Sequence, residues 1–352
     1  MPTIPYIAAS QLAIVIPAYK KIYFEQTLAS IANQTCKDFV LYIGDDSCNE
    51  HFKAVTESYK DRIRIKYKHF DDNLGQKDLV AQWERCIDLV ENEEWIWLFS
   101  DDDIMDPNCV ERFYAMSPTQ TEFDLFHFSL YKIDTNNNII GKFHSFPDIL
   151  NAEEFLARRL TGSINSTAVE YIFRKSHFVE NGRFQKFDLA WGSDDATWIK
   201  LSMNKGIRNI ENANVYWRKS SFNISPNYKD LNILRRKLDA EIDFALWISH
   251  QADQKKLKIS NNAINLQLKR WFLQNIRARI HFLSFKTSSA FLSKLYYTLD
   301  KTKCPKKIIL KYYLLKIYAF AKEIVKNRPG RIRKTTSIPL NYHNHKRKNT
   351  NG

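Results

Sequence analysis

The stretch Glu94-Trp-Ile-Trp-Leu-Phe-Ser-Asp-Asp-Asp103 gives the clearest indication of the fold. An apolar run is followed directly by three aspartates, as in a short buried strand that ends at a polar site. The stretch Phe39-Val-Leu-Tyr-Ile-Gly-Asp-Asp-Ser47 repeats this order, with Asp45 and Asp46 after the apolar run. Ligands of open α/β sheets bind at the carboxyl ends of the strands, so we expect both acidic groups at one site.

Strands and helices alternate around these two stretches. We predict a buried strand at residues 12–19 and a strand nearer the sheet edge at 62–67. Three helical stretches are predicted: one through residues 28–32, a polar one that leads to residue 62, and one on which Val80, Trp83, Ile87 and Val90 recur at spacings of three and four. This alternation predicts an α/β fold with a mostly parallel sheet flanked by helices.

The remaining sequence suggests three parts. Residues 124–133 and 139–146 are predicted to form a β-hairpin, followed by a strand at 168–174, a helix at 194–203 and a strand that ends at residues 217–219. Beyond about residue 225 the pattern is helical, with stretches at 229–253, 260–285 and 305–326. We therefore predict an α/β domain at residues 1–225, a helical C-terminal region at 226–330, and a basic, disordered tail at 331–352.

The chain has 53 basic and 39 acidic residues and a formal net charge of +14. Nucleic acid, anionic lipid and phosphorylated substrates are candidate partners for such a charge. The excess is greatest at the C-terminus, where residues 331–352 contain six Lys or Arg and no acidic residue. Residues 308–322, apolar and aromatic with interspersed lysines, suit either an anionic membrane surface or a helix packed on the α/β domain, with a dimer interface as a third option.

The cysteine pattern and the N-terminus bear on localisation. Five cysteines without CxxC spacing are expected to be reduced thiols, with no structural zinc. The N-terminus lacks the basic region of a signal peptide, and no stretch has the apolar length that a bilayer span needs. We expect a cytoplasmic protein that can also attach peripherally to the inner face of the membrane.

The acidic triplet Asp101, Asp102 and Asp103 is the first candidate site. Adjacent carboxylates repel one another unless solvent or a cation compensates their charge. Mg²⁺ and Mn²⁺ accept carboxylate oxygens and also bind substrate diphosphates, so either ion would suit the triplet. The alternative is that the triplet caps the helix beginning near Pro107, or forms a polar turn.

Five segments in order resemble the opening of a family 2 glycosyltransferase with the GT-A fold. They are Ile14-Val-Ile-Pro-Ala-Tyr19, Ser30-Ile-Ala-Asn-Gln-Thr35, Phe39-Val-Leu-Tyr-Ile-Gly-Asp-Asp-Ser47, Asn73-Leu-Gly75 and Phe99-Ser-Asp-Asp-Asp-Ile-Met-Asp-Pro107. The resemblance covers roughly residues 10–220. It implies an inverting enzyme that uses a nucleotide-sugar donor.

The resemblance also implies residue roles on the donor side. Pro17, Ala18 and Tyr19 match the loop that contacts the nucleotide base and ribose. Asp46 or Asp45 matches the aspartate that bonds the base, usually uracil. The role is assigned to the pair and not to one member, because Asp-Ser-Cys replaces the family's usual Asp-Gly-Ser or Asp-Ser-Ser.

The family's Asp-x-Asp motif corresponds to Asp101, Asp102 and Asp103. The resemblance makes Asp103 the direct metal ligand and gives Asp101 the ribose or a metal-bound water. Asp102 is grouped with the same donor site.

On the acceptor side, Asp194 and Asp195 open a predicted helix in Trp191-Gly-Ser-Asp-Asp-Ala-Thr-Trp198. Family 2 enzymes place the catalytic base in such an acidic pair, which implies Asp195 as the base, since it is usually the second acid. The alternative is an ordinary helix cap with acidic first-turn residues. Trp191 is either a platform for the acceptor sugar or a core residue. Arg218 either reaches the diphosphate, to which a guanidinium is suited, or lies at the surface.

These observations predict an inverting transferase that moves a sugar, UDP-linked by family habit, to a glycan or lipid-linked glycan hydroxyl. A nucleic-acid- or membrane-surface-binding protein without catalysis is the alternative, although no nucleic-acid-binding motif is found. A sugar nucleotidyltransferase is disfavoured, because Pro17-Ala-Tyr-Lys-Lys21 stands where that class needs a Gly-rich loop. The sequence gives no prediction of oligomeric state.

Overall fold

The structure is a computed structural model that describes residues 11–47, 51–117, 122–223 and 230–260, with single helical positions at 263, 268, 271, 290, 293, 314 and 317. The chain divides into two compact units, Met1–Lys306 and Lys307–Gly352. Apart from Leu314 and Ile317, the 308–322 segment and the basic tail lie outside the described residues, as do Cys48 and Cys304. The domain division predicted from the sequence stays a prediction. The first unit contains the sheet and its flanking helices.

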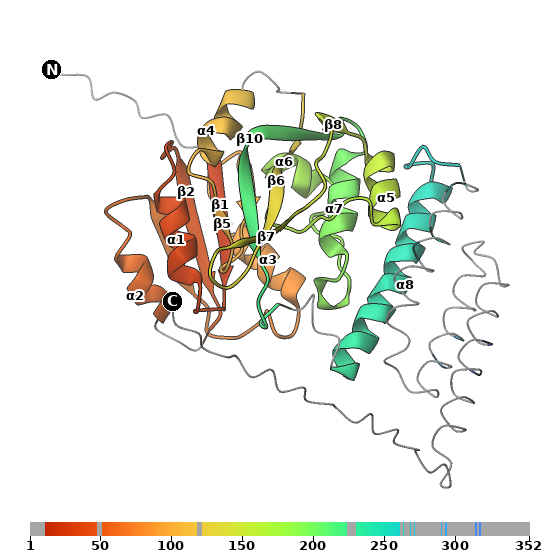
Figure 1. Cartoon of the computed structure of the whole chain (residues 1–352), viewed down its shortest axis with the longest axis horizontal. Coiled ribbons are helices and arrows are strands. Elements are labelled where there is room, and N and C mark those ends of the chain that lie inside the picture. Colours follow the sequence, from red (N-terminus) through yellow and green to blue (C-terminus); the bar gives the residue numbers. More distant parts are fainter. Residues whose placement is uncertain are drawn as a thin grey trace, which may run out of the picture. The chain divides into compact units, whose positions relative to one another are not determined.

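A ten-stranded sheet forms the centre of this unit (Figure 1). The strands run in the order β3-β2-β1-β4-β9-β6-β10-β5, with β7 beside β6 and β8 beside β10. Their bounds are β1 (Leu12–Ala18), β2 (Phe39–Asp45), β3 (Ile65–His69), β4 (Trp95–Leu98), β5 (Ile104–Met105), β6 (Leu125–Ile133), β7 (Ile139–Lys142), β8 (Ile149–Leu150), β9 (Tyr171–Arg174) and β10 (Ile207–Arg218). The pairs of β1 with β2 and β4, of β2 with β3, and of β6 with β10 are parallel, whereas β9 is antiparallel to both of its neighbours.

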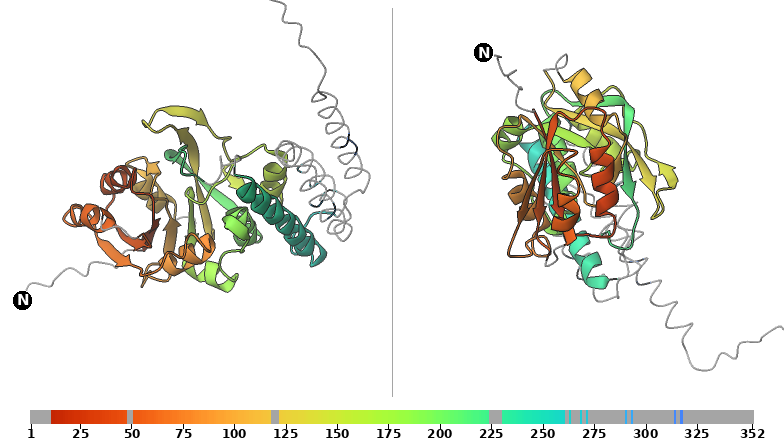
Figure 2. Two further views of the ribbon diagram at one scale, coloured as in Figure 1. Left: turned by 90° about the horizontal axis from the view of Figure 1, so that it is seen from below. Right: turned by 90° about the vertical axis from the view of Figure 1, so that its left-hand side faces the viewer.

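Helices flank the sheet (Figures 1 and 2). They are α1 (Phe24–Ala32), α2 (His51–Glu57), α3 (Leu79–Ile87), α4 (Cys109–Met116), α5 (Ala152–Thr161), α6 (Lys175–Glu180), α7 (Ser193–Ser202) and α8 (Leu231–Asp253), with a short 3-10 turn η1 (Asp188–Ala190). The mostly parallel sheet with flanking helices is therefore confirmed. Within the described part of the chain, no helix has the length and apolar character needed to cross a membrane.

The strand β1 is buried on both faces, which explains its unbroken apolar sequence. Leu12, Ile14 and Ile16 join one core with Phe24 and Leu28 of α1. The alternate residues of the strand are also buried, and α3 packs against β1. By contrast β3 is half exposed at the end of the sheet, where its alternating sequence predicted an edge position.

Aromatic side chains fill the space beside β4. The Trp97 ring stacks on Phe128 with centroids 4.8 Å apart, and its indole N–H donates to the Val169 carbonyl at 2.6 Å. Trp95 meets Phe113 edge to face with centroids 5.5 Å apart. These contacts fix the strand that leads into the acidic triplet.

Several elements were not predicted. The longest strand, β10, was predicted only at its Trp217–Arg218 end, because a bulge interrupts its alternation between Ile210 and Asn214. Helix α5 was missed although both of its ends have clear signals. Asn151 Oδ1 accepts from Glu154 N–H at 2.8 Å, and Gly162 ends the helix at φ +70°.

Gly44 lies where β2 and α3 approach most closely. A Cβ at this position would lie 2.3 Å from Cys86 Sγ and 3.0 Å from the Phe70 ring. We predict that Gly44→Ala lowers the free energy of unfolding by about 1–3 kcal/mol, because overpacking forces the helix away from the sheet. Urea denaturation measures this. Gly141→Ala is the control, since its Cβ would meet only Lys132 Cβ at 3.9 Å; equal effects of the two changes would contradict the prediction.

Candidate active site

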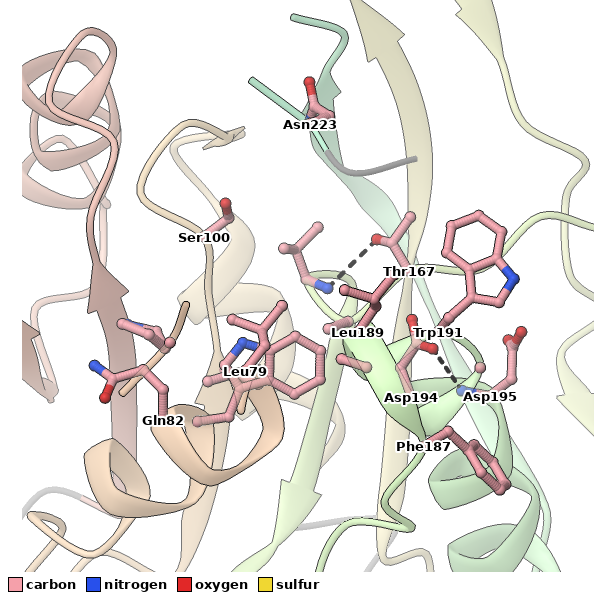
Figure 3. A pocket seen from close by; sticks show the side chains of 18 of the residues that line it. Leu79, Gln82, Ser100, Thr167, Phe187, Leu189, Trp191, Asp194, Asp195 and Asn223 are labelled. Atoms are coloured by element: carbon pink, nitrogen blue, oxygen red, sulfur yellow. Dashed lines mark hydrogen bonds between the residues drawn. The ribbon is translucent and has the colours of Figure 1, made fainter. Parts of the chain in front are cut away.

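A cavity of about 1170 Å³ lies at the carboxyl ends of β1, β2 and β4. One wall is formed by these strand ends and by α3, and the opposite wall by the start of α7 with the loop before it. Figure 3 shows Gln82 and Ser100 on the first wall, with Trp191, Asp194 and Asp195 on the other. Residues of α8, among them Arg236, Glu241 and Phe244, also line it. A cavity of this size is ample for a small-molecule ligand.

Asp101 joins the acidic triplet to the loop after β1. Its Oδ2 accepts hydrogen bonds from the backbone N–H groups of Tyr19 at 2.7 Å and Lys20 at 2.5 Å. Burial, followed by the charge of Asp102, raises the pKa of Asp101 to about 6, although Lys20 and the two N–H donors act in the opposite direction. Two loops that are 82 residues apart in the sequence are thus held together at one edge of the sheet.

The ammonium group of Lys20 lies among the aspartates. Its Nζ is 2.6 Å from Asp102 Oδ2 and 3.4 Å from Asp101 Oδ1. Burial alone would lower the pKa of Lys20, but the facing carboxylates outweigh burial and raise it, so the side chain is charged. The sequence analysis did not single out Lys20, because one lysine in a loop gives no local signal.

Asp103 is buried and faces β10. Its Oδ1 accepts from the backbone N–H of Arg218 at 2.7 Å, and its carbonyl accepts from the Thr27 hydroxyl at 2.8 Å. Burial and the neighbouring Asp102 raise its pKa well above the ordinary aspartate value. The triplet does not cap α4, whose Asn108 cap position makes no side-chain cap bond.

The structure corrects the proposed contact of Arg218 with the diphosphate. Arg218 is fully buried and is not among the described residues that line the cavity. Its guanidinium donates to the carbonyl oxygens of Asp102 at 2.7 Å and Asp134 at 3.1 Å, and to Gln26 Oε1 at 3.1 Å. Because its donors are used behind the triplet, Arg218 supports the acidic loop instead of facing a ligand.

Carboxylate oxygens are the ligands that Mn²⁺ and Mg²⁺ prefer, and Asp101 and Asp103 supply them. Asp102 Oδ2 is a further buried oxygen, and the Lys20 ammonium lies 2.6 Å from it. Within the same residues, no group of three or more His, Cys, Asp or Glu side chains is arranged to hold a metal. An ion held by these carboxylates would take its remaining ligands from a bound molecule or water, as Mg²⁺ commonly does.

The second acidic pair divides into two roles. Asp46 lines the cavity, and its Oδ2 accepts from Gly75 N–H at 2.8 Å. Asp45 does not line the cavity; it accepts from the Tyr67 hydroxyl at 2.6 Å and from Ser47 N–H at 2.8 Å. In the first loop, Pro17 and Tyr19 line the cavity, whereas Ala18 is fully buried beneath them.

Asp194 and Asp195 lie in the first turn of α7, after Gly192 at φ +83°. Both line the cavity. Asp195 is held by Arg159 of α5, whose Nε and Nη2 lie 2.7 and 2.5 Å from its two carboxylate oxygens. Asp194 is partly exposed, and its Oδ1 accepts from Asp195 N–H at 2.9 Å (Figure 3). Burial and the neighbouring Asp195 charge raise the pKa of Asp194 to about 7.

Trp191 projects into the cavity from the loop before α7 (Figure 3). Helix α8 fixes its ring: the indole N–H donates to Glu241 Oε1 at 3.0 Å, and Lys237 Nζ lies 4.5 Å from the ring centroid. Arg236 of the same helix pairs with Asp188 at the start of the loop, at 2.6 Å. Trp191 is therefore a partly exposed cavity residue with a fixed orientation.

The sequence of residues 13–178 matches Glycosyl transferase family 2. A validoxylamine A glucosyltransferase of Streptomyces hygroscopicus subsp. jinggangensis is 38% identical over 74 residues, 20% of this chain and 17% of that protein. An uncharacterised glycosyltransferase of Rickettsia conorii is 23% identical over 217 residues, 57% of this chain and 32% of that protein. A GalNAc(5)-diNAcBac-PP-undecaprenol beta-1,3-glucosyltransferase of Campylobacter jejuni is 23% identical over 201 residues, 55% of this chain and 60% of that protein. The chain spans less than two thirds of the length of each of these relatives.

Among solved structures, S. aureus TarS 1–349 in complex with UDP-GlcNAc has a similar fold, with a TM-score of 0.60. The two chains are 15% identical, and the match covers 90% of this chain and 89% of that one. The GT-A-like fold is therefore confirmed. The match to the family model over residues 13–178 and the GT-A-like fold agree with each other.

The buried position of Arg218 gives a test of its supporting role. We predict that Arg218→Met lowers the free energy of unfolding by about 3–5 kcal/mol, because buried carbonyl oxygens lose their donors and the triplet loses a nearby cation. Urea denaturation measures the loss. Lys219→Met is the control, since Lys219 is exposed and should change stability by less than about 0.5 kcal/mol. An Arg218→Met protein of wild-type stability would contradict the role.

Proposed function

From the family 2 match and the GT-A-like fold, we propose that this protein is an inverting glycosyltransferase that uses a nucleoside-diphosphate sugar. The supporting observation is that two acidic groups line one cavity: the triplet after β4 and the pair at the start of α7. A sugar transfer needs both a place for an anionic leaving group with its cation and a base for the acceptor hydroxyl.

The donor is proposed to bind at the ends of β1, β2 and β4. Pro17 and Tyr19 would contact the nucleotide, and Asp46, which lines the cavity, is the better candidate than Asp45 for the base. A UDP-sugar is favoured, because TarS was solved with UDP-GlcNAc in the same fold. Asp103 and Asp101 would hold Mn²⁺ or Mg²⁺, which would offset the charge that develops on the departing diphosphate.

We propose Asp194 as the catalytic base in place of Asp195, which the sequence favoured. Both oxygens of Asp195 are engaged by Arg159, and an oxygen paired with a guanidinium is a poor proton acceptor. Asp194 has a carboxylate with a pKa near neutrality, which suits a general base. The Arg159–Asp195 pair would then position the first turn of α7.

The proposed reaction is a single in-line displacement. The acceptor oxygen forms a bond to the anomeric carbon, the bond from that carbon to the diphosphate oxygen breaks, and Asp194 takes the hydroxyl proton. The configuration at the anomeric carbon is inverted, and no covalent intermediate forms on the protein.

The acceptor is proposed to be a glycan or lipid-linked glycan hydroxyl. The Campylobacter jejuni relative is named for an undecaprenol-linked acceptor, and sugar rings have apolar faces that stack on indole. Trp191, held against α8, would supply that platform. Peripheral attachment to an anionic membrane through the basic C-terminal region would suit such an acceptor.

Nucleotide binding tests the donor site without knowledge of the acceptor. We predict that UDP with Mn²⁺ raises the melting temperature, since a ligand at a hundred times its Kd adds about 2.7 kcal/mol of stability. EDTA should abolish the shift, and so should Asp103→Asn. Differential scanning fluorimetry with UDP, GDP, CDP and dTDP measures this. Asp71→Asn, a change at an exposed position, should retain the full shift; an equal shift in Asp103→Asn would remove Asp103 from the site.

The base assignment predicts a pH profile. The carboxylate must be deprotonated to accept a proton, so kcat/KM should fall about tenfold per pH unit below pH 7 and level off above it. Asp194→Asn should lower kcat by about 10²–10⁴-fold while retaining UDP binding. A radiolabelled-sugar transfer assay measures both. If Asp194→Asn turns over normally while Asp195→Asn is inactive, the base is Asp195.

A further inference from the structure

Lys20 faces one carboxylate oxygen of Asp101 and one of Asp102, while the other oxygen of each carboxylate accepts hydrogen bonds from neighbouring groups. In Asp101, Oδ2 is taken by two backbone N–H groups and Oδ1 faces the Lys20 ammonium at 3.4 Å. In Asp102, Oδ1 accepts from the Ser100 hydroxyl at 2.5 Å and Oδ2 faces the ammonium at 2.6 Å. The lysine therefore occupies the place where a cation would approach the triplet.

Because Asp101 and Asp102 are almost fully buried, moving the Lys20 ammonium away from them costs free energy. The side chains of Asp101 and Asp102 are 3% and 1% exposed, while that of Lys20 is 24% exposed. Two nearly buried carboxylates without a counter-ion would repel each other, so the ammonium stabilises the pair. A divalent cation entering the same place must either displace the ammonium or share the oxygens with it at the cost of repulsion.

We propose that Lys20 is an internal counter-cation that a divalent metal ion displaces, so that metal and the diphosphate of the donor bind cooperatively. Lys20 itself lines the cavity, and its displaced ammonium needs a new anionic partner. A diphosphate bound in the cavity supplies that partner. The coupling to the donor rests on the proposed function, whereas the competition between Lys20 and metal does not.

Cooperativity follows from linkage. If the diphosphate binds the displaced ammonium, it lowers the cost of metal binding, and the metal tightens diphosphate binding by the same factor. The enzyme would then bind metal weakly when free and tightly with its donor. The neighbouring Lys21 is exposed and provides a matched control, since its replacement removes the same charge from the same loop.

The test measures Mn²⁺ binding to the full chain by electron paramagnetic resonance, without nucleotide. Lys20→Met should bind Mn²⁺ at least about tenfold more tightly than wild type, equivalent to about 1.4 kcal/mol, and Lys21→Met should match wild type. Added UDP should tighten Mn²⁺ binding in wild type and Lys21→Met by a larger factor than in Lys20→Met. Unchanged or weaker Mn²⁺ binding by a folded Lys20→Met protein would overturn the proposal.

A second measurement applies to the wild-type protein if Lys20→Met does not fold. Reductive methylation followed by peptide mass spectrometry reports the accessibility of each lysine. Saturating Mn²⁺ should accelerate modification of Lys20 and leave that of Lys21 unchanged; an unchanged rate at Lys20 would overturn the displacement. If UDP fails to bind in any variant, the donor assignment fails, while the Mn²⁺ comparison without nucleotide still decides the role of Lys20.

Discussion

The structure depends on compensation of buried negative charge at the carboxyl edge of the sheet. Three successive aspartates lie almost without solvent at the end of β4, and each is held by a different part of the chain. Asp101 accepts from the loop after β1, Asp102 from Ser100, and Asp103 from the backbone of β10. The hydrogen bonds that stabilise the buried carboxylates therefore also fix the positions of β1, β4 and β10 around the cavity. The function of the site and the stability of the fold rest on one set of contacts.

Much of the proposed donor half could be predicted because its signals are local. The apolar runs that became β1, β2 and β4 end directly at the residues that line the cavity, and a parallel arrangement places those ends together. The roles of individual side chains were harder to predict. Whether Asp45 or Asp46 faces the cavity depends on hydrogen bonds from elsewhere in the chain. The Tyr67 hydroxyl bonds Asp45, and the Gly75 N–H bonds Asp46.

The proposed acceptor half could be predicted only in part, because its geometry comes from long-range packing. Asp195 is 36 residues from Arg159, and the pairing depends on the contact of α5 with α7. Arg218 is 115 residues from Asp103. It is buried at the end of β10, and a bulge interrupts the alternating sequence pattern of that strand. The sequence placed the acidic pair on the correct helix, but it contained no information on which carboxylate an arginine would occupy.

The loop that presents Trp191 has an unusual backbone. Leu189 and Ala190 have φ values of 57° and 54°, in a region that side chains with a Cβ adopt at a cost. Contacts from α8, through Arg236 and Glu241, hold this conformation. The two halves of the cavity are thus built from separate stretches: one from the first hundred or so residues, the other from α5, α7 and α8. Substitutions along α8 can reshape one half without touching the other. On the proposed function, the range of molecules that receive the transferred group can therefore diversify during evolution while the chemistry of its activation is retained.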